Sequence, residues 1–196
     1  MFLSTLYLLL AHLVADFLLQ PESLVRWKHK STIGLAIHAA IHWFVMLALL
    51  APFGLDKVIL VVTGILAMAH FAVDWAKITL EPKLKLYYQL FVVDQTIHLL
   101  LILVAGYLLS GFVSMQTGGS VFLDYYSNEA TILGLCIVII ATYAYELGAY
   151  QLQREYSPKA VFKPDFRAML KRLILSSVVY GLLMIFGVYQ LAAFGG

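Results

Sequence analysis

Long apolar stretches separated by short polar segments make up most of this chain. Most of these stretches reach the roughly 20 residues that a helix needs to cross a bilayer, although the first is shorter. The pattern predicts an all-α, polytopic integral membrane protein with about six transmembrane helices. The six stretches are Phe2–Leu19, Ile33–Ala51, Val58–Leu80, Leu84–Ser110, Ala130–Gln151 and Met169–Phe194.

The composition agrees with this class. Of the 196 residues, 62% are hydrophobic and 12% are charged, which is not the composition of a soluble globular domain. No polar segment is long enough to fold separately, so we expect one integral membrane domain over residues 1–196, surrounded by the lipid bilayer and without a nucleic-acid partner. The first apolar stretch lacks a basic leader and a small-residue cleavage site, so we do not expect a signal peptide.

The basic residues predict how the chain is oriented. All but one of the 13 Lys and Arg residues fall after the first stretch, between the third and fourth, or between the fifth and sixth. Only Lys57 lies in a loop of the other side. By the positive-inside rule we expect a multi-pass protein of a bacterial inner membrane, with both termini outside in the periplasm. The basic residues expected inside are Arg26, Lys28, Lys30, Lys77, Lys83, Lys85, Arg154, Lys159, Lys163, Arg167, Lys171 and Arg172.

Four pairs of ionisable residues interrupt the first four apolar stretches. The members of each pair are four residues apart, which places them on one face of a helix. An aspartate near the bilayer centre costs about 2.5–3.5 kcal/mol on insertion scales, so a set of eight ionisable residues, three of them aspartates, needs a compensating partner. With the orientation above, all four pairs lie in the cytoplasmic half of their helices, and we expect one shared site. The pairs are His12/Asp16, His38/His42, His70/Asp74 and Asp94/His98.

A short repeat relates the pairs to each other. Residues 11–17 and 69–75 share the pattern Ala-His-x-x-x-Asp-aromatic, and each copy is followed by a loop and a helix with a second pair. This predicts two helical hairpins related by a pseudo-twofold axis, which form a four-helix bundle in residues 1–110 around a polar metal site. Residues 111–196 would supply flanking helices 5 and 6. The repeat divides the eight residues into His12, Asp16, His38, His42 and His70, Asp74, Asp94, His98.

Nitrogen and oxygen ligands without sulfur favour zinc, with manganese or iron as alternatives, and the number of groups allows one or two ions. The single Cys136 excludes disulfides and a thiolate cluster, and we expect it to be a small core residue. Some of the eight residues could orient ligands rather than bind metal. Gln20 and Gln95 could do the same, or cap helices.

Three lysines lie near the expected site. Lys77 follows Asp74 by three residues and could bind a substrate phosphate, so it is the candidate catalytic residue, although a snorkelling lysine would look the same. Lys28 and Lys30 belong to a short amphipathic segment at the interface and could meet phosphates of lipid or substrate. Further along the chain, Glu146 is expected to pair with Arg154.

Other functions fit parts of the pattern. Hydrogen bonds between helices would use the same residues, but each is worth only about 0.6–2 kcal/mol in membranes. A haem would need imidazoles alone, and a diiron oxidase would need more than one His-x-x-x-His box. A transporter would need polar groups beyond the site, whereas the outer halves of these helices are almost entirely apolar. A site that opens only to the cytoplasm favours a catalytic function over transport across the membrane.

Two strings carry a resemblance to a known family. His12-x-x-x-Asp16-Phe17-x-x-Gln20, followed by Asp94-Gln95-x-x-His98, resembles a bacterial inner-membrane family catalogued as domain of unknown function 3307. The likeness covers about the first half of the chain and implies no activity or substrate. A looser likeness, through His-x-x-x-Asp patterns, is to inner-membrane proteins labelled metal-dependent hydrolases.

The leading hypothesis is therefore a membrane-embedded metal-dependent hydrolase of phosphoester or lipid-like substrates that arrive from the cytoplasmic side. The alternatives are a non-catalytic metal-binding or metal-transport protein and a structural membrane subunit without metal. The pattern leaves homo-oligomers open.

Overall fold

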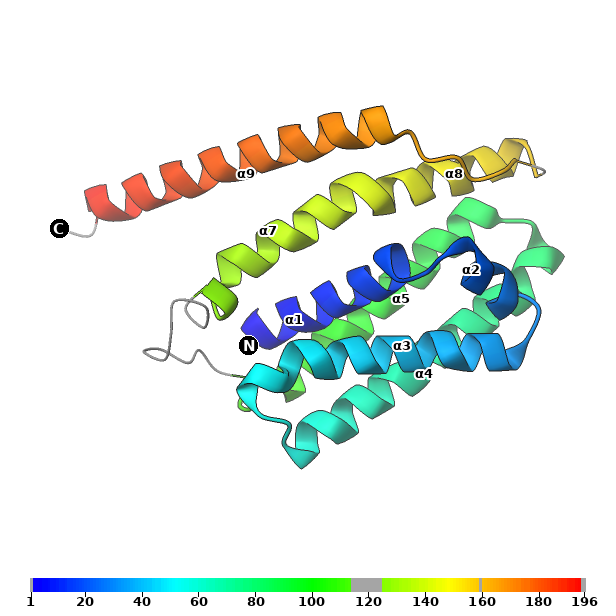
Figure 1. The fold of residues 1–196 in the computed structure, drawn as a ribbon, viewed down its shortest axis with the longest axis horizontal. Coiled ribbons are helices and arrows are strands. Elements are labelled where there is room, and N and C mark those ends of the chain that lie inside the picture. The colour runs from blue at the N-terminus through cyan, green and yellow to red at the C-terminus, as the bar shows by residue number, and fades with distance from the viewer. Residues whose placement is uncertain (1, 114–124, 159, 195–196) are drawn as a thin grey trace.

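The computed structural model describes residues 2–113, 125–158 and 160–194, and these contain helices and no strand. The long helices run side by side along the longest axis of the molecule (Figure 1). In chain order the elements are α1 (Phe2–Leu13), η1 (Val14–Leu18), α2 (Glu22–Lys28), α3 (Thr32–Leu50), η2 (Ala51–Phe53), α4 (Lys57–Leu84), α5 (Tyr87–Leu108), α7 (Glu129–Ile139), η3 (Ile140–Ala144), α8 (Tyr145–Tyr156) and α9 (Phe166–Phe194).

Five helical segments of the described residues are long and apolar enough to cross a membrane. A sixth is obtained if Phe2–Leu18 and Glu22–Lys28, which meet at 97°, are taken as one broken span. The all-helical prediction is therefore confirmed for the described residues, and their five to six candidate spans are consistent with a multi-pass membrane protein. The five segments are Thr32–Phe53, Lys57–Leu84, Tyr87–Leu108, Glu129–Tyr156 and Phe166–Phe186.

Polar side chains at the first turns define where several helices begin. Ser31 accepts a hydrogen bond from Ile33 N before α3, and Asp56 accepts one from Val58 N before α4. These caps satisfy backbone donors that have no partner inside the helix. At its other end α4 continues to Leu84, four residues past the predicted boundary, so that Lys77 lies well inside the helix rather than at its end.

Two helices contain a π-helical turn that the apolar pattern did not predict. The turn η1 follows α1 and carries Asp16, and η3 joins α7 to α8. The two turns contact each other where the first helix meets the α7–α8 segment. A π-turn inserts one extra residue into the helical register and redirects the side chains on either side of it.

The first four long helices form a closed ring of contacts. The helix α1 packs against α3 and α5, α3 packs against α4, and α4 packs against α5, while α7 covers α1 from outside the ring. Contact between α1 and α5 is close, because a Cβ on Gly106 would lie 2.8 Å from the Cα of Thr5. In the same way, a Cβ on Gly34 would lie 2.7 Å from the backbone of Trp27, so α2 rests directly on the start of α3.

The helix α9 lies outermost, beside α7 and η3 (Figure 1). Only 6% of the most apolar 18-residue stretch of this helix is buried inside the protein, as expected for a helix that faces lipid. Arg172 of α9 forms an ion pair with Glu146, and Arg154 of α8 pairs with Glu81 at 2.7 Å. The predicted pairing of Glu146 with Arg154 is therefore wrong, because Arg154 instead lies next to the end of α4.

The segments that hold most of the basic residues lie at one end of the molecule, which we call the basic end. The helix α2, the connection between α4 and α5, and the segment between α8 and α9 all lie there (Figure 1). Lys57 begins α4 at the opposite, far end, where α1 begins and α9 ends. Lys159 falls outside the described residues. The predicted orientation, with this end toward the cytoplasm, depends on this separation of the basic segments from Lys57.

Candidate metal centre

The eight residues of the four pairs come together inside the ring of α1, α3, α4 and α5. Asp16 is partly buried and the other seven are buried. Their ligand atoms fall into three groups, within each of which the atoms lie within 4.8 Å of one another. The groups are Asp16, His38, His42 and His70; Asp74, Asp94 and His98; and His12, His70 and His98.

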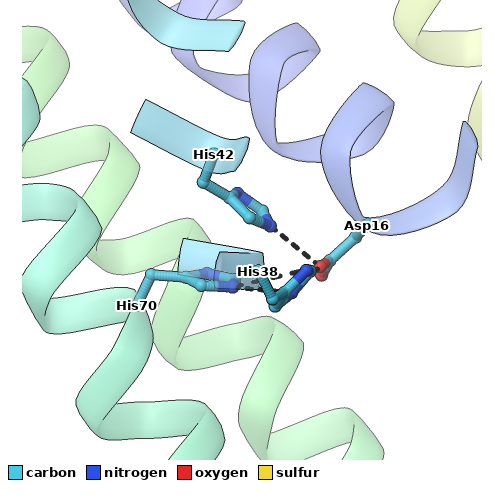
Figure 2. Close-up of side chains that lie close together, drawn as sticks. All are labelled: Asp16, His38, His42 and His70. Carbon is cyan, nitrogen blue, oxygen red and sulfur yellow. Dashed lines mark hydrogen bonds and ion pairs between the residues drawn. The ribbon is translucent and has the colours of Figure 1, made fainter. Parts of the chain in front are cut away.

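In the first group, imidazoles from two helices surround one carboxylate of η1 (Figure 2). Asp16 Oδ1 lies 3.0 Å from His42 Nε2 and 3.1 Å from His38 Nε2. His70 Nε2 of α4 lies 4.0 Å from the same oxygen and 3.2 Å from His38 Nε2. Three imidazole nitrogens and one carboxylate oxygen at these separations match the donor set of a four-coordinate zinc, manganese or iron site.

The second group has two carboxylates and one imidazole. His98 Nε2 lies 3.5 Å from Asp94 Oδ1 and 3.6 Å from Asp74 Oδ1. Asp94 Oδ1 and His98 Nε2 are buried and have no hydrogen-bond partner in the described part of the chain. Buried polar atoms without partners are rare in folded proteins, and an ion is one of the standard reasons for them.

Asp74 lies between the two groups. Its Oδ1 faces His98, whereas its Oδ2 lies 3.5 Å from His38 Nε2 and 3.9 Å from His70 Nε2. A carboxylate with one oxygen toward each group has the position of a bridging ligand in a two-metal site.

The imidazoles and carboxylates form two layers along the bundle. One layer contains a single histidine from each of the four helices: His12, His42, His70 and His98. The rings of His42 and His70 lie 3.7 Å apart between centroids, and those of His70 and His98 lie 4.2 Å apart. The second layer, one helical turn nearer the basic end, consists of Asp16, His38, Asp74 and Asp94.

Apolar side chains close the histidine layer toward the far end. A cavity of about 20 Å³, roughly enough for one water, lies between the four imidazoles and this apolar layer. Each member of the layer is four residues from one of the histidines and one turn nearer the far end. The four residues are Leu8, Met46, Leu66 and Ile102.

Two lysines contact the carboxylates from the basic end. Lys28 Nζ donates to Asp74 Oδ2, and Lys77 Nζ donates to Asp94 Oδ2, both at 2.8 Å. The Lys28 and Lys77 side chains are 10% and 19% exposed, compared with 4% and 2% for the two aspartates. The lysine side chains are therefore less deeply buried than the carboxylates that they contact.

Two glutamines complete the hydrogen bonding. Gln20 Nε2 lies 3.2 Å from the ring nitrogens of His38. Gln95 Oε1 lies 3.4 Å from His12 Nε2, and its Nε2 donates to Asp94 Oδ2 at 3.1 Å. Both glutamines have the contacts expected of residues that orient ligands.

The family described as a protein of unknown function (DUF3307) matches residues 4–123. The chain belongs to this family. The match begins in α1 and includes α5, so the DUF3307 region contains all eight residues, both lysines and both glutamines. No curated protein and no solved structure matches the chain.

Within the DUF3307 region, the grouping of the residues differs from the one that the repeat suggested. His70 joins Asp16, His38 and His42, and His12 lies with His70 and His98. The groups thus cross between the two predicted hairpins, because facing helices of a bundle bring their side chains to a shared axis. A repeat in sequence states which residues are equivalent but not which residues are neighbours.

Two features of the DUF3307 region were not predicted. Lys28 was expected at the interface with Lys30, but it is folded inward onto Asp74 while Lys30 is exposed. The single layer that four apolar residues form next to the histidines was also not predicted from the sequence. Its signal is present in the sequence, since each member is spaced four residues from a histidine on the side away from the basic loops.

Proposed function

We propose that this chain is a membrane-embedded metal-dependent hydrolase of phosphoester or lipid-like substrates, with a dinuclear site in the cytoplasmic leaflet of a bacterial inner membrane. One ion would be held by Asp16, His38, His42 and His70, and the second by Asp94 and His98 with Asp74 as a bridge. Zinc is the first expectation, and manganese and iron suit the same donors. The DUF3307 match carries no activity, so the proposal depends on the site itself.

The observation that carries the proposal is the pair of atoms Asp94 Oδ1 and His98 Nε2. They lie 3.5 Å apart, are buried, and have no hydrogen-bond partner within the described residues. A purely structural hydrogen-bonded core would satisfy such atoms. A cation between them and Asp74 would give both atoms a direct partner.

The proposal includes the arrangement that the repeat predicts. Residues 1–110 would form a four-helix bundle of two pseudo-equivalent hairpins around the metal, with residues 111–196 as flanking helices and both termini outside. The closed ring of contacts among α1, α3, α4 and α5 supports this arrangement. The position of the basic segments at one end supports the orientation.

Ions of this type polarise a phosphoryl oxygen and activate a water for attack. The chain's own residues would position the substrate and exclude bulk water. Lys77 and Lys28 lie between the carboxylates and the basic end, where a substrate would arrive. The apolar layer blocks passage to the far end, which favours a hydrolase over a metal transporter.

Metal analysis of purified protein tests the proposal directly. We expect wild-type protein, prepared without chelator, to contain one or two equivalents of zinc, manganese or iron. His70→Ala should lose most of the metal, because His70 belongs to two of the three groups. His29→Ala is the matched control, since this exposed histidine lies outside all three groups and its loss should leave the metal content unchanged.

Metal-free wild-type protein would overturn the proposal. Metal content with no hydrolysis of any phosphoester or ester in a substrate panel would instead favour the non-catalytic metal-binding alternative. Hydrolysis that is lost in His38→Ala and Asp94→Ala together with the metal would support the enzyme.

A further inference from the structure

The charges inside the bundle do not balance once metal is bound. Three carboxylates face the centre, those of Asp16, Asp74 and Asp94, and two ammonium groups lie against them, those of Lys28 and Lys77. With neutral imidazoles this set has a net charge of minus one. Two divalent ions would change it to plus three, and a single ion would change it to plus one.

An uncompensated positive charge is unfavourable at this depth. The surrounding helices are apolar, and charged groups inside a membrane protein persist only when they are paired. A metal site that served only to hold its ion would not need two further cations against its ligand carboxylates. The two lysines therefore indicate that a negatively charged group belongs to the loaded centre.

The lysines are placed to receive such a group. Both ammonium nitrogens lie 2.8 Å from a carboxylate oxygen, and both lysine side chains are more exposed than the aspartates that they contact. Lys77 Nζ also lies 5.6 Å from the ring centroid of Phe91. Lysine presents a compact charge on a flexible stem, so each ammonium can move from a carboxylate to an anion that binds beside it.

For the two-ion centre proposed above, the size of the imbalance identifies the class of anion. A monoanion such as acetate would leave a two-metal centre strongly positive, whereas a phosphate dianion offsets most of the excess. A phosphate also offers several acceptor oxygens, enough to meet two ions and two ammonium groups at once.

We propose that Lys28 and Lys77 bind the phosphate group of the substrate as a two-lysine clamp, so that metal and phosphate dianion bind cooperatively to this centre. This inference rests on the proposed metal-dependent function and specifies its substrate as a phosphate monoester rather than a carboxylic ester. Cooperativity is reciprocal, so it can be measured as an effect of phosphate on metal affinity without any turnover.

The test uses the full-length protein in phosphatidylcholine nanodiscs, with Mn²⁺ as the metal and inorganic phosphate as the anion. Electron paramagnetic resonance separates free from bound Mn²⁺. We expect phosphate to tighten Mn²⁺ binding by about 10-fold or more, within the roughly 5–150-fold range of typical couplings, and acetate to have no such effect.

Variants then assign the effect to the clamp. In the double variant Lys28→Met, Lys77→Met, Mn²⁺ should bind at least as tightly as in wild type without phosphate, because two competing cations are gone. The phosphate effect should fall below about 2-fold, short of the usual coupling range. Lys28→Arg, Lys77→Arg keeps both charges and should retain coupling, and Lys30→Met is the control at an exposed neighbouring lysine.

The outcomes separate this inference from the proposed function. Mn²⁺ binding without any phosphate effect, or an undiminished effect in the methionine double variant, would overturn the clamp and leave the metal site intact. Absence of Mn²⁺ binding would overturn both. Coupling without hydrolysis would support the clamp and argue against the hydrolase.

Nanodiscs that contain phosphatidic acid identify the source of the phosphate. Tighter Mn²⁺ binding in the presence of this lipid would assign a lipid headgroup, whereas tighter Mn²⁺ binding with soluble phosphate alone would assign a soluble substrate.

Discussion

Two sets of charged residues lie near the basic end of this molecule, and they are built in different ways. At the outer contacts of α8 and α9, Arg154 meets Glu81 and Arg172 meets Glu146, one cation to one carboxylate. Inside the bundle, three carboxylates, five imidazoles and two ammonium groups share one space. Each outer pair joins one cation to one carboxylate, whereas the inner set contains two buried atoms that have no hydrogen-bond partner among the described residues.

The difference shows how a structural ion pair can be distinguished from a site. Each outer guanidinium also covers an aromatic ring, since Arg154 lies 4.1 Å from the Tyr87 ring centroid and Arg172 lies 4.3 Å from that of Tyr145. Such contacts use both the charge and the flat face of the guanidinium, and they hold neighbouring helices together. The inner set uses lysines, whose charges are easily redirected, and imidazoles, which are good metal ligands.

The largest effect on folding should come from breaking an outer pair. Arg172→Met leaves the Glu146 carboxylate unpaired and removes the donor to the Ala141 carbonyl, so we expect the free energy of unfolding to fall by about 3 kcal/mol. Titration with a denaturing detergent, followed by circular dichroism, measures this loss. Metal content should not change.

The double variant Arg172→Met, Glu146→Gln is the matched control, because it removes the unpaired charge. It should recover part of the lost stability. Loss of metal from folded Arg172→Met protein would contradict the separation between the two sets.

A smaller effect is expected at the edge of the inner set. Gln95→Leu removes the contact with His12 and the hydrogen bond to Asp94, and we expect metal affinity to fall by about 10-fold, as for other groups that orient ligands. Competition with a chelator of known affinity measures it. Gln89→Leu, at an exposed position of the same helix, should have no effect. Equal losses in the two variants would mean that Gln95 acts only through general stability.

The smallest effect is expected away from both sets. Cys136 is buried in α7 among apolar residues of the core, so Cys136→Ala should lower the free energy of unfolding by about 1 kcal/mol through the small cavity it leaves. Metal content and metal affinity should stay the same. A variant that loses metal would show that the thiol takes part in the site, against its position in the fold.

The sequence was sufficient for the helices and for the expectation that the eight ionisable residues lie close together. Apolar runs of spanning length and His/Asp spacings of four residues are local properties of a helix, and both were read without knowledge of tertiary contacts. The two π-turns could not be read, because one extra residue in a turn leaves no trace in an apolar stretch.

The contacts between helices were the other part that sequence could not supply. Glu146 was matched with the nearest basic residue on its own helix, but it pairs with Arg172, 26 residues away. Lys28 was placed at the surface by its charged neighbours, but close contact between Trp27 and Gly34 brings α2 against the bundle and Lys28 onto Asp74. Such contacts depend on how helices pack, which a single sequence states only indirectly.

The apolar layer of Leu8, Met46, Leu66 and Ile102 has an energetic consequence for the proposed function. In the proposed hydrolase, ions and protons that reach the histidines would have to leave through the same end by which they arrived. No net charge would then cross the membrane over a complete reaction cycle, so neither the transmembrane voltage nor a proton gradient would supply energy to the reaction. We therefore expect dissipation of the voltage with an ionophore to leave the overall equilibrium of the reaction unchanged.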